Sequence, residues 1–292
     1  PAAPRALQAM RVVSETQGEL MSVGRTWQVT RRLVRQGAIA LSAAAAWLAS
    51  LAWAADEWAD WRVAGGFVCR ADFSLADCEP LLGELAHLQE DLVRVLGIPA
   101  AEERIELYLF RNEADYRNYL SVCFPEVPYR RALYIKRGGP GVVLTFRSEQ
   151  LATDLRHECT HALLHAVLPM VPLWLDEGLA EFFEVAPELR AFGNPHLSKV
   201  RWNARFGIRT PIAKLENKGS VGEMSGVDYR DSWAWVHFIL YGSAEAHAEL
   251  VGFLREISAN VPPGKLSVRL SRRIADLDGQ YLAHFRGWAP KG

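Results

Sequence analysis

The stretch His157-Glu-Cys-Thr-His161 is the most informative part of this sequence. It lies inside a predicted helix, which fixes how its side chains are arranged. Apolar residues recur at helical spacing over residues 148–168, and Pro169 and Pro172 then break the pattern. Residues four apart on a helix share one face, with Cβ atoms about 5–6 Å apart, so the two imidazoles can bind one zinc ion. The motif is only suggestive by itself, and the alternative is a helix that carries incidental histidines.

Glu158 lies beside this histidine pair. In a helix Glu158 lies to one side of the face that carries His157 and His161. From there it can reach a water on the zinc ion. Zinc lowers the pKa of that water, and the carboxylate takes the proton that the water releases. We therefore predict Glu158 as the catalytic base of a zinc hydrolase.

Two glutamates on the following segment complete the predicted site. Residues 174–185 form a second predicted helix, and the turn between Pro169 and Pro172 lets it return antiparallel to the first. Glu177 can then complete a His, His, Glu site that leaves one position open for water. Glu181 lies one turn further along the same face and can accept the free N–H of a ligating imidazole. The alternative is a solvated helix face, which the apolar character of this segment argues against.

Two motifs in this order, His-Glu-x-x-His at residues 157–161 and Trp-Leu-x-Glu-Gly-x-Ala at residues 174–180, resemble the gluzincin metallopeptidases of the peptidase MA clan. Residues 100–245 are similar to a bacterial peptidase-MA-like domain. In the gluzincins the glutamate of Glu-Gly-x-Ala is the third zinc ligand, which falls on Glu177, and an acid four residues later supports the site, which falls on Glu181. The resemblance implies a zincin-like fold, one zinc ion and a peptide or protein substrate.

The resemblance also implies a donor for the oxyanion that forms during peptide hydrolysis. In enzymes of the aminopeptidase N type a tyrosine just before a helix supplies this hydrogen bond. Tyr229 is similar in its placement and in the apolar helix that follows it. Tyr241 and His237 are weaker candidates for the same role, and a Tyr229 that only packs at a helix start is the other alternative.

The Gly-x-Met-Glu-Asn segment with which the aminopeptidase N type holds a free amine is missing from residues 55–156. Its absence favours an endopeptidase over an aminopeptidase. In gluzincins an edge strand before the active helix pairs with the substrate backbone by strand addition. Val142–Phe146 stands at that place in this sequence, and an ordinary inner strand is the alternative.

Strands are predicted before helices, which is the order of an α+β fold. Apolar patterning predicts strands at residues 105–110, 132–136 and 142–146, with a glycine-rich turn between the last two. Helical spacing predicts helices at 80–96, 113–122, 148–168, 174–185, 229–241 and 245–257. We therefore expect a small mixed sheet followed by a helical half. Both lie in one zincin-like domain of residues 55–292, with an α/β half at 55–147 and a helical half at 148–292.

The near-neutral charge of the chain hides two different parts. The 292 residues carry 33 basic and 34 acidic side chains, and half of all residues are hydrophobic, which excludes a disordered chain. Residues 1–54 contain six arginines and two glutamates, which leaves 27 basic and 32 acidic residues for the body. A mildly acidic body predicts no nucleic-acid partner.

Residues 1–54 are a predicted leader with a signal peptide. Arg31, Arg32 and Arg35 precede an uncharged run rich in alanine and leucine, which ends in the small-x-small pattern of residues 52–54 that a signal peptidase reads. Such a signal starts near Met21, so residues 1–20 are interpreted as an over-extended start or an untranslated stretch. We expect an exported bacterial protein, periplasmic or extracellular. The alternative is an uncleaved leader that anchors the chain in a membrane.

Export changes how the four cysteines are interpreted, because an oxidising compartment permits disulfides. Cys69 and Cys78 can close a short loop there. Buried free thiols are the alternative.

The sequence thus predicts an exported zinc metallopeptidase that acts as an endopeptidase. The first alternative is a zinc hydrolase of non-peptide amides or esters, which would use the same ligands. The second is a zincin domain kept as a binding module without catalysis. The presence of Glu158 argues against the second, because a purely structural zinc site does not need that carboxylate.

Overall fold

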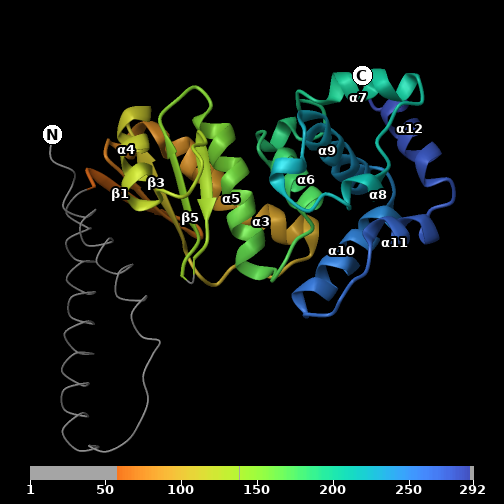
Figure 1. Cartoon of the computed structure of the whole chain (residues 1–292), viewed down its shortest axis with the longest axis horizontal. Helices are drawn as coiled ribbons and strands as arrows, with labels where there is room; N and C mark the ends of the chain where they lie inside the picture. Colours follow the sequence, from red (N-terminus) through yellow and green to blue (C-terminus); the bar gives the residue numbers. More distant parts are fainter. Residues whose placement is uncertain (1–57, 138, 290–292) are drawn as a thin grey trace, which may run out of the picture.

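The computed structural model describes residues 58–137 and 139–289 of the chain. Figure 1 shows the sheet at one end of the molecule and the later helices at the other. The predicted arrangement of a mixed sheet followed by a helical half is confirmed at this level. The predicted leader at residues 1–54 lies outside the described residues. None of the described helices is long and apolar enough to cross a membrane.

A five-stranded sheet forms the first half of the described chain. Its strands are β1 (Asp60–Ala64), β2 (Phe67–Ala71), β3 (Ile105–Phe110), β4 (Ala132–Ile135) and β5 (Val142–Phe146), in the order β1-β2-β3-β5-β4 across the sheet. The three inner strands run parallel, and each edge strand is antiparallel to its neighbour. The predicted pairing of residues 132–136 with 142–146 is confirmed, whereas β1 and β2 were not predicted.

The rest of the described chain is mostly helical, with short 3-10 turns at Leu75–Cys78, Pro187–Leu189 and Val221–Glu223. The helices are α3 (Glu79–Leu96), α4 (Glu113–Cys123), α5 (Leu151–Val167), α6 (Leu173–Phe183), α7 (Leu197–Arg205), α8 (Ile212–Leu215), α9 (Gly226–Tyr241), α10 (Ala244–Ser258), α11 (Leu266–Arg273) and α12 (Leu277–Gly287). The predicted helices are confirmed with small shifts at their ends. The sequence patterns did not predict α7, α8, α11 and α12.

The strand β4 lies at the edge of the sheet, so the prediction that Val142–Phe146 is the edge strand was wrong. Leu144 of β5 is opposite Tyr108 of β3 on one side and Leu133 of β4 on the other. Four of the five side chains of β5 are buried, against two of the four of β4. The more apolar strand therefore takes the inner position, where both of its faces are covered.

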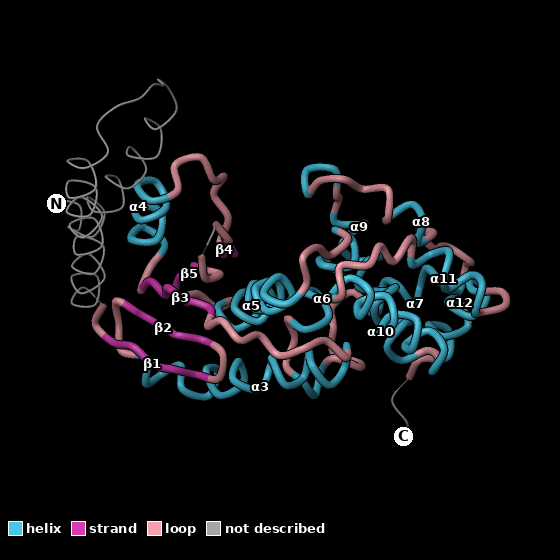
Figure 2. Tube along the Cα trace, turned by 90° about the horizontal axis from the view of Figure 1, so that it is seen from below, coloured by secondary structure: helices cyan, strands magenta, loops and turns pink. Residues whose placement is uncertain are grey.

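Helices cover both faces of the sheet, because successive side chains of a strand point to opposite sides. On one face, Leu107 and Val143 belong to a hydrophobic cluster with residues of α3 and α5. On the other face, Leu144 and Phe146 cluster with Tyr116 and other residues of α4. Figure 2 shows α3 and α5 on one side of the strands and α4 on the other. The packing places α5, which carries residues 157–161, directly against the sheet.

The helices α6 and α9 approach each other closely, and Gly178 permits this approach. A Cβ atom on Gly178 would lie 2.7 Å from the carbonyl oxygen of Ser232 and 2.9 Å from Cγ2 of Val236. Tyr229 lies in the first turn of α9. The close packing at Gly178 therefore also determines where Tyr229 lies relative to α6.

We expect Gly178→Ala to destabilise the fold, because the added methyl group overlaps backbone that can move only if α9 shifts. The expected loss in free energy of unfolding is about 1–3 kcal/mol, measured by chemical denaturation. Gly83→Ala is the matched control, since nothing lies within 4 Å of a Cβ at Gly83 in α3. Equal stability of the Gly178→Ala variant and the wild type would contradict this explanation.

Candidate metal centre

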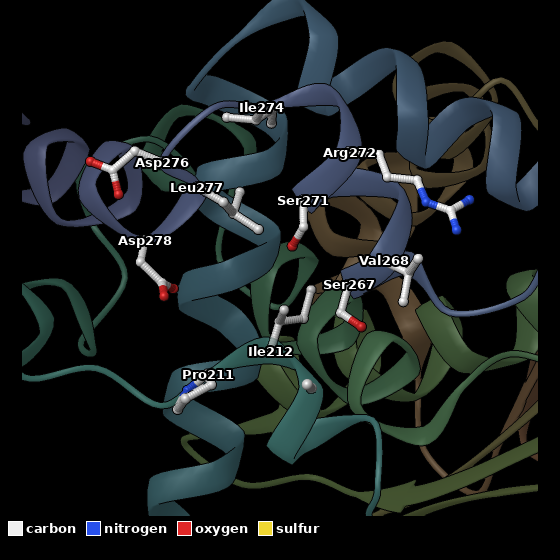
Figure 3. Close-up of a pocket in the computed structure, with 11 residues that line it drawn as sticks. Pro211, Ile212, Ser267, Val268, Ser271, Arg272, Ile274, Asp276, Leu277 and Asp278 are labelled. Carbon is white, nitrogen blue, oxygen red and sulfur yellow. The ribbon is translucent and has the colours of Figure 1, made fainter.

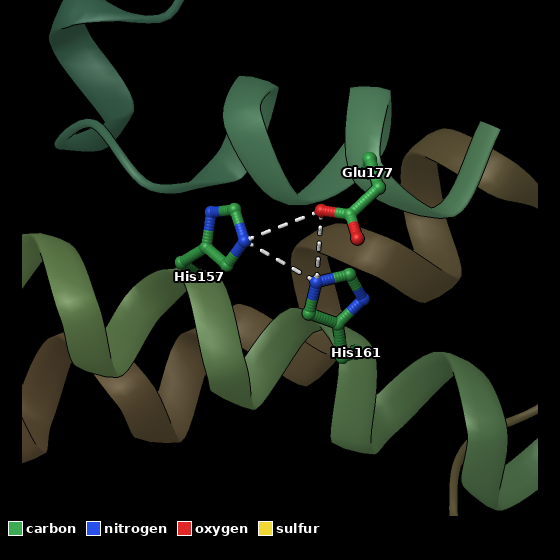
Figure 4. A group of neighbouring side chains, drawn as sticks. All are labelled: His157, His161 and Glu177. Atoms are coloured by element: carbon green, nitrogen blue, oxygen red, sulfur yellow. Dashed lines mark hydrogen bonds and ion pairs between the residues drawn. The ribbon is translucent and has the colours of Figure 1, made fainter. Parts of the chain in front are cut away.

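His157, His161 and Glu177 converge between α5 and α6 (Figure 4). The two histidines lie one turn apart on α5, and Glu177 points toward them from α6. Their Nε2 atoms are 3.2 Å apart. Oε2 of Glu177 lies 3.7 Å from Nε2 of His157 and 3.6 Å from Nε2 of His161. The structure therefore brings together the three side chains that the sequence predicted as metal ligands.

The short connection between α5 and α6 explains why the two helices face each other. Residues 168–172 separate them, and so short a connection makes the helices antiparallel neighbours. Leu168 ends α5 in extended backbone, and Pro172 stands at the N-cap of α6. Buried leucines such as Leu164 and Leu175 then hold the helices together. This local arrangement places Glu177, in the second turn of α6, opposite the histidines.

The three side chains fit a tetrahedral zinc ion. Ligand atoms about 2.0–2.1 Å from zinc in a tetrahedral arrangement lie about 3.4 Å from one another. The observed separations of 3.2–3.7 Å are close to that value. Two imidazole nitrogens and one carboxylate oxygen are also a donor set of catalytic zinc sites, in which the fourth position stays open for water.

Carboxylates contact the outer nitrogen of each imidazole. Nδ1 of His157 lies 3.0 Å from Oε2 of Glu184. Nδ1 of His161 lies 3.0 Å from Oδ1 of Asp176. Asp176 is held in turn by His165, whose Nε2 lies 2.9 Å from Oδ2 of Asp176. Outer carboxylates of this kind fix the orientation of metal-binding imidazoles, so that Nε2 of each ring stays directed at the metal position.

The charges of this cluster favour protonated imidazoles in the metal-free protein. Burial lowers the pKa of His161, but Asp176 and Glu177 outweigh it and raise that pKa to about 9. Burial also opposes protonation of His157, yet Glu177 and Glu184 hold its pKa well above the usual value. Burial raises the pKa of Glu177, but the two histidines lower it to about 2. A metal ion must therefore displace protons from both imidazoles, and its affinity rises with pH.

Glu181 does not make the contact that the sequence predicted for it. Oε2 of Glu181 lies 3.0 Å from Nε2 of His196, and Glu184 takes the place beside His157. The reason is the antiparallel crossing of the two helices. His157 precedes His161 on α5, so it faces a later part of α6, near its C-terminal end. The supporting carboxylate for His157 is thus Glu184, and the prediction for Glu181 is corrected.

Substitutions at these two glutamates test this correction. We expect Glu184→Gln to weaken zinc binding about 10–100-fold, because a neutral amide replaces the charged partner of His157. Glu181→Gln is the matched control and should leave the zinc affinity nearly unchanged. Competition with a chromogenic chelator measures both affinities. The correction fails if Glu181→Gln weakens zinc binding as much as Glu184→Gln does.

The carboxylate of Glu158 is half-buried beside the ligand cluster. Among the described residues it has no hydrogen bond or ion pair, in contrast to Glu177 and Glu184. Its negative charge acts on the adjacent His157. A carboxylate without a protein partner is free to bind water, which is the arrangement that a general base requires.

Tyr229 is half-buried in the first turn of α9, whose start is fixed by a capping box between Ser225 and Asp228. Burial raises the pKa of Tyr229, the charge of Glu177 raises it further, and the guanidinium of Arg130 lowers it in part. The net increase keeps the hydroxyl protonated at neutral pH, so it can donate a hydrogen bond. Ser232 follows Tyr229 by three residues and lies against Gly178, the neighbour of Glu177, so the first turns of α9 lie next to the part of α6 that carries Glu177.

The two weaker candidates for the same role lie further along α9. His237 is fully buried, and its Nδ1 lies 3.0 Å from Nε2 of His284. Burial lowers the pKa of His237 to about 3. Tyr241 is the last residue of α9, about 18 Å along the helix from Tyr229, and its ring packs against Trp288. Of the three candidates, Tyr229 is therefore the best placed.

The edge strand β4 lies along α5, and two contacts hold it there. Arg131 makes two hydrogen bonds of 2.6 Å to the carboxylate of Asp154. Nζ of Lys136 donates to the backbone oxygen of His165 at 3.0 Å. Asp154 precedes the His157–His161 pair on α5 and His165 follows it, so β4 spans the length of the motif. Within the described part of the chain, no strand pairs with the outer edge of β4.

A hollow of about 640 Å³ lies among α8, α11 and α12 (Figure 3). Its lining includes Pro211, Ile212, Ser267, Arg272 and Asp278. None of the ligand residues or their carboxylate partners contributes to this lining. The hollow is therefore separate from the histidine cluster between α5 and α6.

The cysteines take no part in the candidate site. All four are free thiols, and three of them, including Cys69 and Cys78, are buried. Burial raises the pKa of Cys69 to about 12. The structure thus agrees with the alternative of buried free thiols, and the short disulfide loop is not present.

A scan against models of protein families finds no match to this chain, and a search of curated proteins finds none either. The likeness to the gluzincins therefore depends on the motifs at residues 157–161 and 174–180.

Proposed function

We propose that the protein is a zinc-dependent metallopeptidase with a zincin-like arrangement of sheet and active helix. The observation that carries the proposal is the convergence of two imidazole nitrogens and one carboxylate oxygen, 3.2–3.7 Å apart, beside a carboxylate without a partner. His157, His161 and Glu177 would hold one zinc ion. Glu158 is the free carboxylate next to them.

The protein groups around this centre match the demands of amide hydrolysis. Zinc, when bound, supplies a Lewis acid that acidifies water and polarises a carbonyl group. Glu158 accepts the proton of the attacking water and passes it to the amine that leaves as the peptide C–N bond breaks. Tyr229 donates a hydrogen bond to the carbonyl oxygen as negative charge develops on it.

The free edge of β4 supports a peptide as the substrate. An extended peptide can add to this edge as a further strand, through hydrogen bonds between main chains. Contacts to Asp154 and His165 hold β4 alongside α5, so a peptide added there would pass the ligand cluster. Because the chain lacks the segment that holds a free amine in aminopeptidases, we propose cleavage within a peptide chain. Because residues 1–54 are a predicted export signal, we propose that this cleavage takes place outside the cytoplasm.

The proposal is tested by measuring metal content and hydrolysis on the same preparation. We expect about one zinc ion per chain and cleavage of internally quenched peptides from a mixed library. A chelator should stop the cleavage, and added zinc should restore it. A panel of small amides and esters, run in parallel, separates a peptidase from a hydrolase of other substrates. A chain that holds zinc but cleaves nothing would support the binding module, and a chain that binds no zinc would refute the metal centre.

We expect Tyr229→Phe to lower kcat about 10²–10³-fold with little change in KM, because the lost hydrogen bond forms mainly in the transition state. Steady-state kinetics on a cleaved peptide measure the effect. Tyr241→Phe is the matched control, since Tyr241 lies at the opposite end of α9. Wild-type kcat in the Tyr229→Phe variant would remove Tyr229 from the reaction.

A further inference from the structure

The helix α7 lies in the helical half of the molecule, away from the sheet (Figure 1). Large apolar side chains at its C-terminal end are exposed to solvent. Trp202, Phe206 and Ile208 are 54%, 61% and 57% exposed. The rings of Trp202 and Phe206 pack together, with their centroids 5.0 Å apart. Three large apolar side chains gathered at one helix end are more than the scattered exposed residues of an ordinary surface.

This cluster is held rigidly by the fold. Val200 and Ala204 are buried on the opposite face of α7 and anchor the helix. The helix ends in a Schellman motif, in which the N–H of Ile208 donates to the oxygen of Asn203 and that of Gly207 donates to the oxygen of Ala204. Gly207 has the left-handed backbone that this motif needs, with φ of 69°. In this motif the residue at the Ile208 position commonly packs against an apolar residue at the Asn203 position. Asn203 is polar, and Ile208 stays exposed.

Basic side chains surround the apolar cluster. Residues 189–215 contain six basic residues and no acidic residue, in a body that is acidic as a whole. Lys199 and Arg205 are exposed and lie three residues before and after Trp202, so all three share one helix face. Arg286 from α12 lies beside the end of α7, where its Nε donates to the oxygen of Ala204 at 2.8 Å. The cluster is thus apolar at its centre and cationic at its rim.

We propose that this surface, the α7 patch of Lys199, Trp202, Arg205, Phe206 and Ile208, binds the protein to an anionic lipid surface. Tryptophan and phenylalanine beside lysine and arginine are the side chains with which peripheral helices enter the boundary between headgroups and acyl chains. The positive rim matches the negative charge of anionic headgroups. A nucleic acid would use the rim alone and leave the apolar centre in water, so the lipid surface explains more of the patch.

The lipid-binding inference does not depend on the proposed peptidase activity. The α7 patch contains none of the metal ligands or their carboxylate partners. It also differs from the anchor predicted in the leader, because it lies in the folded body. Docking through α7 would hold the folded body at a membrane surface with or without a leader.

Hydrogen–deuterium exchange of the full chain with lipid vesicles tests the α7 patch. We expect mixed phosphatidylglycerol–phosphatidylcholine vesicles to slow amide exchange in residues 197–209, and high salt to reverse the effect. Vesicles of phosphatidylcholine alone should have little effect. Because the method locates the protected segment, binding through the leader is distinguished from binding through α7. Unchanged exchange in residues 197–209, or equal protection by both kinds of vesicle, would overturn the proposal.

Two double variants test the apolar and cationic parts separately. Trp202→Gln with Phe206→Gln, and Lys199→Glu with Arg205→Glu, change exposed positions only and should each weaken vesicle binding at least about 10-fold. Trp61→Gln is the matched control, because Trp61 on β1 is 62% exposed at the sheet end and should not affect binding. Concentration-dependent protection without lipid would assign the patch to a second copy of the chain. Tighter binding to DNA than to vesicles would assign it to nucleic acid. Either result overturns the lipid assignment.

Discussion

Replacing Glu158 by glutamine is expected to abolish peptide hydrolysis and to leave zinc bound. Glutamine has nearly the size of glutamate but cannot accept the proton, so kcat should fall about 10²–10⁴-fold, the usual contribution of a general base. Glu158 has no hydrogen bond or ion pair among the described residues, so its replacement should not disturb the three ligand side chains. Turnover of a cleaved peptide and zinc content by mass spectrometry measure the two effects.

The variant Glu181→Gln is the control for a carboxylate lost from the same region. Glu181 lies within the acidic cluster beside His157, but its own partner is His196. The Glu181→Gln variant should bind zinc and turn over peptide as the wild type does. Wild-type turnover in Glu158→Gln would contradict the role of Glu158 as the base. Loss of zinc from that variant would instead mean that Glu158 belongs to the metal-binding set.

Replacing Glu177 by glutamine is expected to remove zinc itself, and activity with it. Glu177 is 6% exposed, and the amide fills the same space, so the fold should survive the change. The loss of a charged ligand should weaken zinc binding more than about 100-fold, beyond the effect typical of an outer partner. In the metal-free variant the pKa of His161, about 9 in the wild type, should also move toward its ordinary value of about 6.5, because one of its two carboxylates is gone.

Metal titration and NMR of the imidazole resonances measure these effects. Recovery of turnover at high zinc concentration would show that Glu177→Gln lowers the affinity and leaves the chemistry intact. Zinc binding as tight as in the wild type would mean that another group is the third ligand. The candidates are His165 and Asp176, which form a second cluster with His161, and Glu181 and Glu184, which form a third with His157.

The pair of metal-binding histidines could be predicted from the sequence because its geometry is local. Residues four apart on any α-helix share a face, and His157 and His161 lie in α5 as expected. Glu177 could be predicted for a related reason. The connection at residues 168–172 is so short that the second helix must pack antiparallel to the first. The helix-breaking prolines at 169 and 172 were the signal for that return.

The carboxylate beside His157 could not be predicted from helical spacing alone. Spacing places Glu181 one turn after Glu177, but the contact depends on how α5 and α6 cross. That crossing results from packing across both helices, including the close contact of Gly178 with Ser232 on α9. Glu184 lies seven residues after Glu177 and inside the predicted helix at 174–185, so spacing puts it on the same face as Glu181 and does not decide between the two.

The strand order was also beyond the local pattern, whereas the first hairpin was missed although the sequence carried a signal for it. Residues 142–146 and 132–135 both have strand character, and only pairing with β3 decides which of them is inside. β1 and β2 are short, but the alternation of Phe67, Cys69 and Ala71 and the adjacent glycine pair at 65–66 were signals that could have revealed them. Which face of α7 is exposed depends on how the neighbouring helices pack against it, so the sequence alone did not predict this face.

By itself, the sequence determined the features that arise within one helix or across one short turn. These are the shared face of His157 and His161, the position of Glu158 beside it and the approach of Glu177. The tertiary structure alone decided that Glu184 supports His157, that β4 forms the free edge and that Trp202 stays exposed in a basic surface. The physical reason is that helical spacing follows from backbone geometry. Crossing angles, strand order and exposure depend instead on contacts between segments far apart in the chain.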